Sequence, residues 1–188
     1  MVVLIIGITA AMATPTLTKQ FLERRSGDAA QRIALLYSSA RMRALGRGSA
    51  VLVRYSKDSR TFSVLESMEG AAVASIGVGE NENCAPRPGL GCLTNNWAAG
   101  STITRPVTSF TPPPELEVAT FAPTGAGVDN ISICFTPLGR SFMTTIADGV
   151  PTAPMVGAPT ITVKRTTGGQ GLTRTIAILP NGMARLAR

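Results

Sequence analysis

The chain opens with an uninterrupted apolar stretch. Residues 1–13 contain no charged side chain, and Pro15 follows them. The stretch is shorter than the roughly 20 residues that a membrane-spanning helix needs. It also lacks the basic start and the clean cleavage region of a signal peptide. It therefore has the character of the second half of a membrane helix. The candidate membrane anchor or filament core consists of Val2, Val3, Leu4, Ile5, Ile6 and Ile8, followed by Pro15.

An amphipathic pattern replaces the apolar one from residue 16 to residue 47. Apolar or small side chains recur every three or four residues, which predicts a helix. The stripe consists of Ala30, Ile33, Tyr37, Ala40 and Ala44. The other face carries the basic side chains Lys19, Arg24, Arg25, Arg32, Arg41, Arg43 and Arg47. Gly46 and Gly48 are typical helix stop signals. At Pro15 we expect a kink and not an end, because proline removes one helical hydrogen bond.

Beyond residue 48 the pattern changes to short β-rich runs without a second helical period. The predicted strands lie near residues 50–55, 61–66, 101–106, 115–121, 131–135, 141–146, 159–165, 174–179 and 183–187, with a weak strand at 70–78. A Gly-, Pro- and Asn-rich insertion is predicted near 77–100. The fold class is therefore α+β, with a long N-terminal α-helix (1–48) packed against an antiparallel β-sheet or sandwich head (49–188).

A short internal repeat marks three predicted hairpin turns. The segments 121–125, 135–139 and 178–182 all read apolar-x-Pro-x-Gly. Proline fixes φ at the first turn position, and glycine accepts the positive φ that closes the turn. Each repeat is therefore expected to end one strand and to begin the next.

The charge is unevenly distributed. The net charge of +7 comes from 18 basic and 11 acidic side chains. After Asp148 there is no acidic side chain, and the basic residues that follow are Lys164, Arg165, Arg174, Arg185 and Arg188. These five are the candidate nucleic-acid contacts, because phosphates attract clustered cations. The basic zone of the helix can instead face anionic lipid or acidic partner subunits. A solvated face without any ligand is the plainer interpretation of either zone.

Three cysteines leave more than one pairing open. Cys84 and Cys92 lie in the Gly-rich insertion, where a short disulfide staple suits an oxidising compartment. The Cys84–Cys92 bridge is the candidate disulfide. Free thiols and a bridge to Cys134 are the alternatives, although the apolar run around Cys134 favours simple burial.

The composition excludes most enzyme classes. The chain has no histidine, which removes Ser–His–Asp and Cys–His arrangements and a general base near neutral pH. Two cysteines without a second pair make a poor zinc site. Gly168–Gly171 joins two β-runs and opens no helix, so it lacks the context of a phosphate-binding loop. We therefore expect no catalytic residue, no metal and no cofactor.

The apolar run with its amphipathic continuation resembles the N-terminal helix of type IV pilins and type II secretion pseudopilins. The C-terminal ILPNGMARL, with its hairpin turn, resembles the head of the GspH/FimT group of minor pilins and pseudopilins. The plainer alternative for residues 1–48 is a buried helix followed by a surface helix of an ordinary soluble domain. An unbroken apolar start suits that alternative poorly.

The resemblance does not extend to the N-terminal processing motif of the family. Prepilins carry a leader, a glycine before the cleavage site, then Phe or Met, and a Glu a few residues later. None of these is present in the printed sequence. We expect the upstream sequence to encode something like GFTLIE in frame. That segment would supply the prepilin peptidase site and the Glu that pairs with a neighbouring subunit. An in-frame stop just before Met1 would count against the resemblance.

The resemblance implies a structural role without enzymatic activity. The first expectation is a minor pseudopilin of a type II secretion pseudopilus that assists protein export. It would be a single-pass inner-membrane protein with a periplasmic head. The implied partners are other major and minor pseudopilins or pilins, contacted through the helix and the head. Prepilin peptidase would act on the full-length precursor.

The alternative is a FimT-like minor type IV pilin involved in pilus assembly or DNA uptake. The FimT group has a Gly-Arg-x-Arg motif, to which Gly182–Arg185 corresponds, with Met183 in place of the first Arg. A soluble periplasmic binding module is a third class, for which the sequence shows no ligand site.

Overall fold

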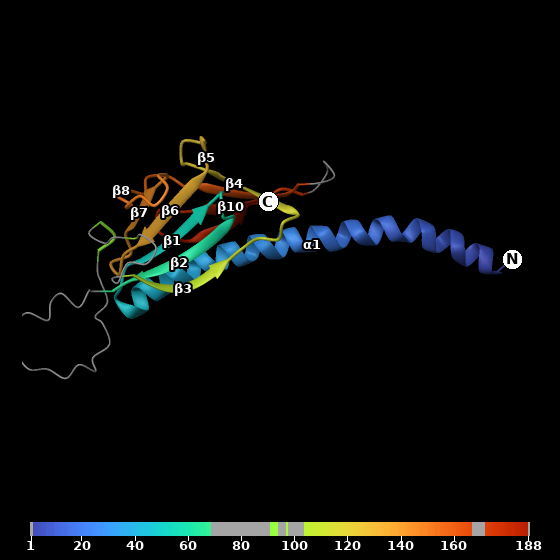
Figure 1. The fold of residues 1–188 in the computed structure, drawn as a ribbon, viewed down its shortest axis with the longest axis horizontal. Coiled ribbons are helices and arrows are strands. Elements are labelled where there is room, and N and C mark those ends of the chain that lie inside the picture. The colour runs from blue at the N-terminus through green and yellow to red at the C-terminus, as the bar shows by residue number, and fades with distance from the viewer. Residues whose placement is uncertain (1, 69–90, 94–96, 98–103, 167–171, 188) are drawn as a thin grey trace, which may run out of the picture.

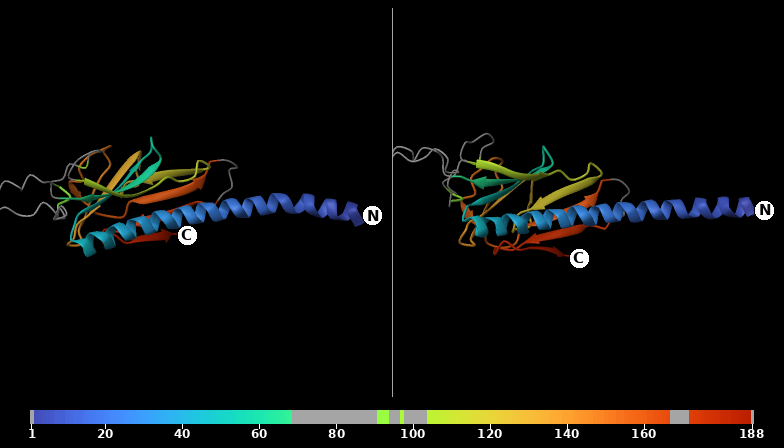
Figure 2. Two further views of the ribbon diagram at one scale, coloured as in Figure 1. Left: turned by 60° about the horizontal axis from the view of Figure 1, so that its bottom comes forward. Right: turned by 90° about the horizontal axis from the view of Figure 1, so that it is seen from below.

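Two antiparallel sheets pack against the C-terminal part of a long helix (Figure 1). The structure is a computed structural model that describes residues 2–68, 91–93, 97, 104–166 and 172–187, with the side chains of the helix described from Glu23 onward. The helix α1 (Val2–Arg47) has 46 residues. Its C-terminal part lies against the sheets, whereas its N-terminal part extends beyond them (Figure 2).

The amphipathic prediction for α1 is confirmed. Each residue of the predicted stripe is buried against the sheets, and Ile33 and Tyr37 at its centre are fully inaccessible. The helix continues through Pro15 without a break, and Figure 1 shows a gentle bend in its blue N-terminal part. It ends at Arg47, followed by Gly48 with a φ of 66°. A glycine in this left-handed conformation is a common way to terminate a helix.

The first sheet has six strands in the order β3-β2-β1-β6-β7-β8, and every neighbouring pair is antiparallel. The chain leaves α1 and enters β1 almost at once, so the centre of this sheet lies next to the end of the helix. The strands are β1 (Val51–Ser56), β2 (Thr61–Ser67), β3 (Thr104–Phe110), β6 (Asn130–Phe135), β7 (Ser141–Thr144) and β8 (Ala153–Pro154).

The second sheet has five antiparallel strands in the order β11-β10-β9-β4-β5. Both β10 and β11 contact α1, so this sheet covers the helix from another direction. The strands are β4 (Leu116–Phe121), β5 (Gly127–Val128), β9 (Thr160–Arg165), β10 (Arg174–Ile178) and β11 (Ala184–Ala187).

Most of the predicted strands are present at the predicted positions. The main difference is β3, which continues past the predicted end at residue 106 as far as Phe110. It contains Pro106, which a strand tolerates here because β3 forms an edge of its sheet. The two-residue strands β5 and β8 were not predicted. The weak strand at 70–78 and most of the insertion near 77–100 lie outside the described residues.

All three repeats form the predicted tight turns. Gly125, Gly139 and Gly182 have positive φ values of 83°, 78° and 79°. Each glycine N–H donates a hydrogen bond to the carbonyl three residues earlier, at 2.7–3.0 Å. The last turn is also packed closely, because a Cβ on Gly182 would lie 2.8 Å from Arg41 Cδ and 2.9 Å from Phe135 Cε1.

The main core fills the space between α1 and the inner faces of both sheets. It contains the helix stripe together with alternate residues of the central strands. Fully burying one such aliphatic side chain contributes about 2 kcal/mol. The inner-face side chains include Val51, Val53 and Tyr55 of β1, Ile131, Ile133 and Phe135 of β6, Ile161 and Val163 of β9, and Ile176 and Ile178 of β10.

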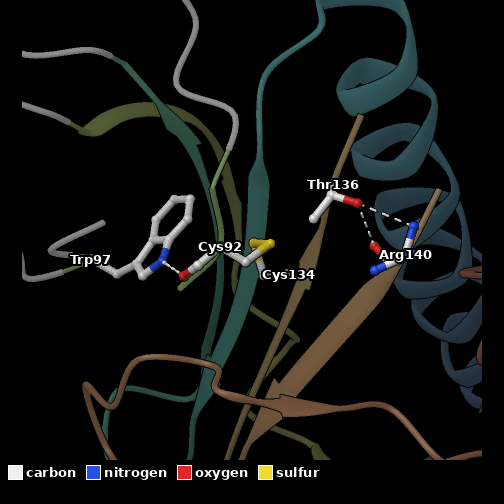
Figure 3. Close-up of a disulfide and its surroundings, with 5 residues drawn as sticks. All are labelled: Cys92, Trp97, Cys134, Thr136 and Arg140. Atoms are coloured by element: carbon white, nitrogen blue, oxygen red, sulfur yellow. Dashed lines mark hydrogen bonds between the residues drawn. A yellow bond between two sulfur atoms is a disulfide. The ribbon is translucent and has the colours of Figure 1, made fainter. Parts of the chain in front are cut away.

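The predicted disulfide pairing was wrong. Cys92 is bonded to Cys134, with their Cα atoms 5.9 Å apart, and not to Cys84 (Figure 3). Cys134 is buried, as expected, but it alternates with Ile133 and Phe135 and therefore points to the outer face of β6. On that face it meets the segment that carries Cys92. Cys84 lies outside the described residues.

The close packing of Gly182 gives a test of the last turn. We expect Gly182→Ala to lower the free energy of unfolding by about 2 kcal/mol or more, because the methyl group adds a clash to the strained left-handed backbone. The matched control is Gly125→Ala, where φ is also positive but nothing lies within 4 Å of the added Cβ. That variant should lose only about 1 kcal/mol. Urea unfolding of the full chain in mild detergent measures both, and equal losses would contradict the packing argument.

Candidate functional site: the helix junction and the basic strands

A buried carboxylate joins the end of α1 to β2. Glu66 follows Phe62 and Val64 on the inner face of its strand, and its side chain is only 1% exposed. Arg43 donates to it through Nη2 at 2.8 Å, Arg47 contacts it through Nε at 2.9 Å, and the Ser49 hydroxyl donates at 2.8 Å. Arg43 and Arg47 belong to the last turns of the helix, where positive charge also favours the helix dipole.

The surroundings of Glu66 keep it ionised. Burial alone would raise its pKa, but the hydrogen bonds from Arg43 and Ser49, together with the charges of Arg43 and Arg47, outweigh burial and lower the pKa. A carboxylate whose pKa is lowered on folding stabilises the folded state above its unfolded pKa, near 4.3. That contribution disappears as the pH falls through the lower folded pKa.

A second ion pair joins α1 to the five-stranded sheet nearer the extended part of the helix. Arg25 Nη1 lies 2.9 Å from Glu115 Oε1, just before β4 begins. This pair is exposed, so water screens it and its contribution to stability is small. The helix is thus attached to the head by a strong buried contact at its end and a weak exposed contact near residue 25.

The candidate anchor residues all belong to the part of α1 that extends beyond the head. Val2 to Ile8 and Pro15 lie on one continuous helix with the residues that Glu66 holds. Their side chains are outside the described part of the structure. Among the described residues, no helix combines the length and the apolar character needed to cross a bilayer.

The candidate nucleic-acid contacts do not form one surface. Cross-strand partners in a sheet point to the same face. Arg165 opposes buried Leu116, and Arg174 opposes buried Val163, so both lie on the inner face. Lys164 and Arg185 lie on the outer face. Arg188 is outside the described residues.

The basic side chains are also partly occupied or enclosed. Lys164 Nζ lies 3.3 Å from Glu117 Oε1 of the neighbouring strand. Nε of Arg174 is buried without a hydrogen-bond partner in the described part of the chain. Arg185 is exposed opposite Ala177, directly after the Gly182 turn. In the described part of these strands, Arg185 is exposed on the outer face without an ion-pair partner, and the cations form no cluster.

A buried arginine on the outer face of the six-stranded sheet was not predicted as a site. Arg54 of β1 donates to Asp148 Oδ1 at 2.6 Å, to the Trp97 carbonyl at 3.1 Å and to Ser132 Oγ at 3.3 Å. Burial lowers its pKa, and the charge of Asp148 partly offsets this effect. The available signal was a charged residue inside the apolar run AVLVRY, because a buried charge requires partners.

The described residues provide no catalytic or metal-binding constellation. They contain no group of His, Cys, Asp and Glu side chains that could hold a metal ion. A cleft of about 490 Å³ lies between β4, β5 and the β1–β2 turn. Its charged side chains already have partners: Lys57 pairs with Asp129, Glu117 pairs with Lys164, and Arg60 donates to the backbone carbonyls of Pro113, Pro114 and Leu116.

One long N-terminal helix packed against antiparallel sheets is the pilin-like fold, as the resemblance in sequence implied. Type IV minor pilin FimU of Pseudomonas aeruginosa strain PAO1 shares it with 18% identity and a TM-score of 0.50, over 89% of this chain and 92% of FimU. Minor pseudopilin EpsH from the type II secretion system of Vibrio cholerae shares it with 11% identity and a TM-score of 0.51, over 88% of this chain and 97% of EpsH.

At these identities the likeness concerns the fold. The sequence matches no family model, and it has no significant match among curated proteins.

The Glu66 contact predicts how stability depends on charge and pH. Glu66→Gln removes the negative charge and leaves two arginines facing a neutral amide, so we expect a loss of about 2 kcal/mol. Below pH 4 the wild-type chain should lose stability more steeply than the variant, because only the wild type must protonate Glu66. Urea unfolding between pH 3 and pH 7, at about one-unit steps, measures both effects.

Glu115→Gln is the matched control for this prediction. It removes the exposed carboxylate that pairs with Arg25, and it should reduce stability less than Glu66→Gln. Losses of the same size in both variants, or identical pH profiles for wild type and Glu66→Gln, would contradict the importance of the buried contact.

Proposed function

We propose that this chain is a minor pseudopilin, a structural subunit of a type II secretion pseudopilus that assists protein export. The observation that carries the proposal is the form of α1. One half is held to the head through Glu66, whereas the apolar half extends beyond the described part of the head (Figure 2). Such a half-helix needs an apolar environment, which a membrane or the core of a filament provides.

The outward face of α1 beside the head supports assembly through helix packing. Leu35 and Met42 are two helical turns apart on this face, and they are 67% and 65% exposed. Apolar side chains at this spacing suit contact with another helix. In this proposal the free apolar half anchors the unassembled subunit in the inner membrane, with its head in the periplasm. The helices of major and minor pseudopilins then surround it in the filament.

A FimT-like minor pilin that takes part in pilus assembly or DNA uptake is the second candidate. Arg185 favours it, because this exposed cation occupies the position of the last Arg in the FimT motif. The division of Lys164, Arg165, Arg174 and Arg185 between two faces weighs against it. Binding to a nucleic-acid backbone uses several cations on one surface.

Cross-linking in the source bacterium tests the assembly role. When the gene is expressed from its own locus, a photo-reactive amino acid at Leu35 or Met42 should cross-link to other pilin-like subunits. The same probe at Glu117, on the outer face of the five-stranded sheet, should give fewer such products. With the probe at Leu35, Met42→Glu should reduce these cross-links without changing the circular dichroism spectrum. Absence of cross-links at all helix positions would overturn the assembly role.

Gene deletion separates the two candidate systems. Under the pseudopilin proposal, deletion should reduce the amount of exported protein and leave DNA uptake unchanged. The purified chain should bind a short DNA duplex no tighter than about 10⁻⁴ M at physiological salt. A tighter, salt-dependent affinity that Arg185→Glu weakens would favour the FimT-like candidate instead.

A further inference from the structure

In the described part of the chain the two sheets have four edge strands, and three of these are protected against pairing with another strand. Proteins protect edge strands by shortness, by proline or by a bulge. The strands β5 and β8 have only two residues each, and β8 includes Pro154. β3 contains Pro106, and its register with β2 shifts between Val64 and Leu65. The fourth edge strand, β11, has four residues with neither a proline nor a shift in register.

The turn before β11 shows which of its backbone groups face outward. Leu179 N–H donates to the Met183 carbonyl at 2.9 Å, so these two residues form a hydrogen-bonded pair. Bonded and non-bonded pairs alternate along an antiparallel ladder. Ala184 and Leu186 therefore direct their backbone N–H and C=O groups away from β10. In the described part of the chain no strand pairs with this outward side. We call the outward backbone groups of Ala184 and Leu186 the free edge.

The hydrogen bonds on the other side of β10 agree with this direction. Ile178 lies opposite Ala184, and its N–H donates to the carbonyl of Pro159, just before β9, at 3.0 Å. The backbone of Ile178 is thus directed toward β9, and the pair that it forms with Ala184 is a non-bonded one.

The side chains of β11 give the free edge two chemically different faces. Leu186 lies opposite Ile176 on the inner face, where Ile176 is fully buried but Leu186 is 41% exposed. Arg185 lies on the outer face opposite the small side chain of Ala177, and it is exposed. A strand added to the free edge would therefore cover an apolar side chain on one face and meet a cation on the other.

The free edge begins beside an exposed apolar part of α1. β11 contacts the helix, and Figure 2 shows the strand next to it. The turn that leads into β11 approaches Arg41, because a Cβ on Gly182 would lie 2.8 Å from Arg41 Cδ. Leu45 lies one helical turn beyond Arg41 on the same face and is 42% exposed. Apolar surface is therefore left uncovered on both the strand and the helix.

Charge indicates the chemistry of the strand that fits this edge. Opposite charges on neighbouring strands stabilise their pairing, and like charges destabilise it. The chain has no acidic side chain after Asp148, so β9, β10 and β11 contain none. A second copy of β11 would bring another Arg185 to the same face of the joined sheet and would supply no carboxylate. An acidic strand from a different chain fits this edge better.

We propose that the free edge of β11 receives an extended strand of a neighbouring pilin-like subunit. This strand carries Asp or Glu next to Arg185 and an apolar side chain next to Leu186. Backbone hydrogen bonds to Ala184 and Leu186 hold it, and the two side-chain positions select it. That the partner is a pilin-like subunit rests on the proposed function, whereas the strand-addition site goes beyond the helix packing described there.

Photo-cross-linking from Ala187 tests the proposal in the source bacterium, with the gene expressed from its own locus. Ala187 lies two residues beyond Arg185 on the outer face of β11, so a photo-reactive amino acid there leaves Arg185 and Leu186 intact. We expect a product with a pilin-like subunit. Mass spectrometry should place the cross-linked residue in a β-strand of that subunit that contains Asp or Glu.

Leu186→Pro tests the backbone contact. It removes an outward N–H without removing a bond to β10, and edge strands tolerate proline at such positions. The yield from Ala187 should fall about tenfold, as expected for the loss of one hydrogen bond. The matched control Leu186→Val keeps the N–H and should keep most of the yield. Circular dichroism and urea unfolding of the purified variants should match those of the wild type.

Arg185→Glu tests the charge contact without changing the backbone. It places like charges next to each other, so the yield from Ala187 should fall several-fold. The control is Arg140→Glu, which reverses an exposed cation between β6 and β7 of the other sheet. That variant should leave the yield unchanged.

Cross-links from Leu35 separate this proposal from the proposed function. Leu186→Pro should leave the products from Leu35 unchanged. Products from Leu35 together with none from Ala187 would overturn strand addition and leave the assembly role intact, whereas loss of both would overturn both. Strand addition is also wrong if Ala187 cross-links to a second copy of this chain or to a helix of the partner. A yield from Ala187 that Leu186→Pro leaves unchanged would contradict it equally.

Discussion

The structure depends on burying one face of α1 between two sheets that share no strand. Ile33 and Tyr37 are fully enclosed at the centre of this contact, and inner-face residues from both sheets surround them. Removing this apolar surface from water is the dominant favourable term for the head. Neither sheet could bury its inner face alone, so the helix belongs to the core of the head as well as to the extended apolar segment. The Tyr37 hydroxyl is enclosed too, and its burial raises its pKa, which keeps the phenol neutral.

Charge then fixes the position of the helix that apolar burial holds in place. An apolar stripe alone would allow the helix to shift along the sheets, because hydrophobic attraction has no preferred direction. The buried carboxylate of Glu66 does not allow such a shift, because the hydrogen bonds that it accepts from Arg43 and Ser49 require one geometry. The exposed pair of Arg25 and Glu115 adds a weaker constraint further along. This division of roles explains why both a long stripe and a single enclosed acid are found along one helix.

Local patterns predicted the local structure. The helix stripe and the apolar-x-Pro-x-Gly turns depend on spacings within a few residues, so the sequence alone placed Tyr37 inward and Gly125, Gly139 and Gly182 in turns. Which residues face each other across neighbouring strands was harder to predict from the sequence. The partner of Cys92 depends on which face of β6 carries Cys134, and this follows from the register with β1. For the same reason the sequence could not place Arg165 and Arg174 on one face and Lys164 and Arg185 on the other. Arg54 escaped notice because its partners, Ser132, Trp97 and Asp148, are distant in sequence.

The direct passage from α1 into β1 has a mechanical consequence. Only Gly48, Ser49 and Ala50 separate the last helical residue from the first strand, and Ser49 is itself bound to Glu66. A load applied along the helix axis therefore reaches the sheet through residues 48–50 and through the contact of Arg43 and Arg47 with Glu66. These connections leave no flexible joint between the helix and the sheet. We therefore expect the head to translate and rotate together with its helix as one rigid body. A displacement of the buried end of the helix is thus reproduced at the far end of the head without being absorbed on the way.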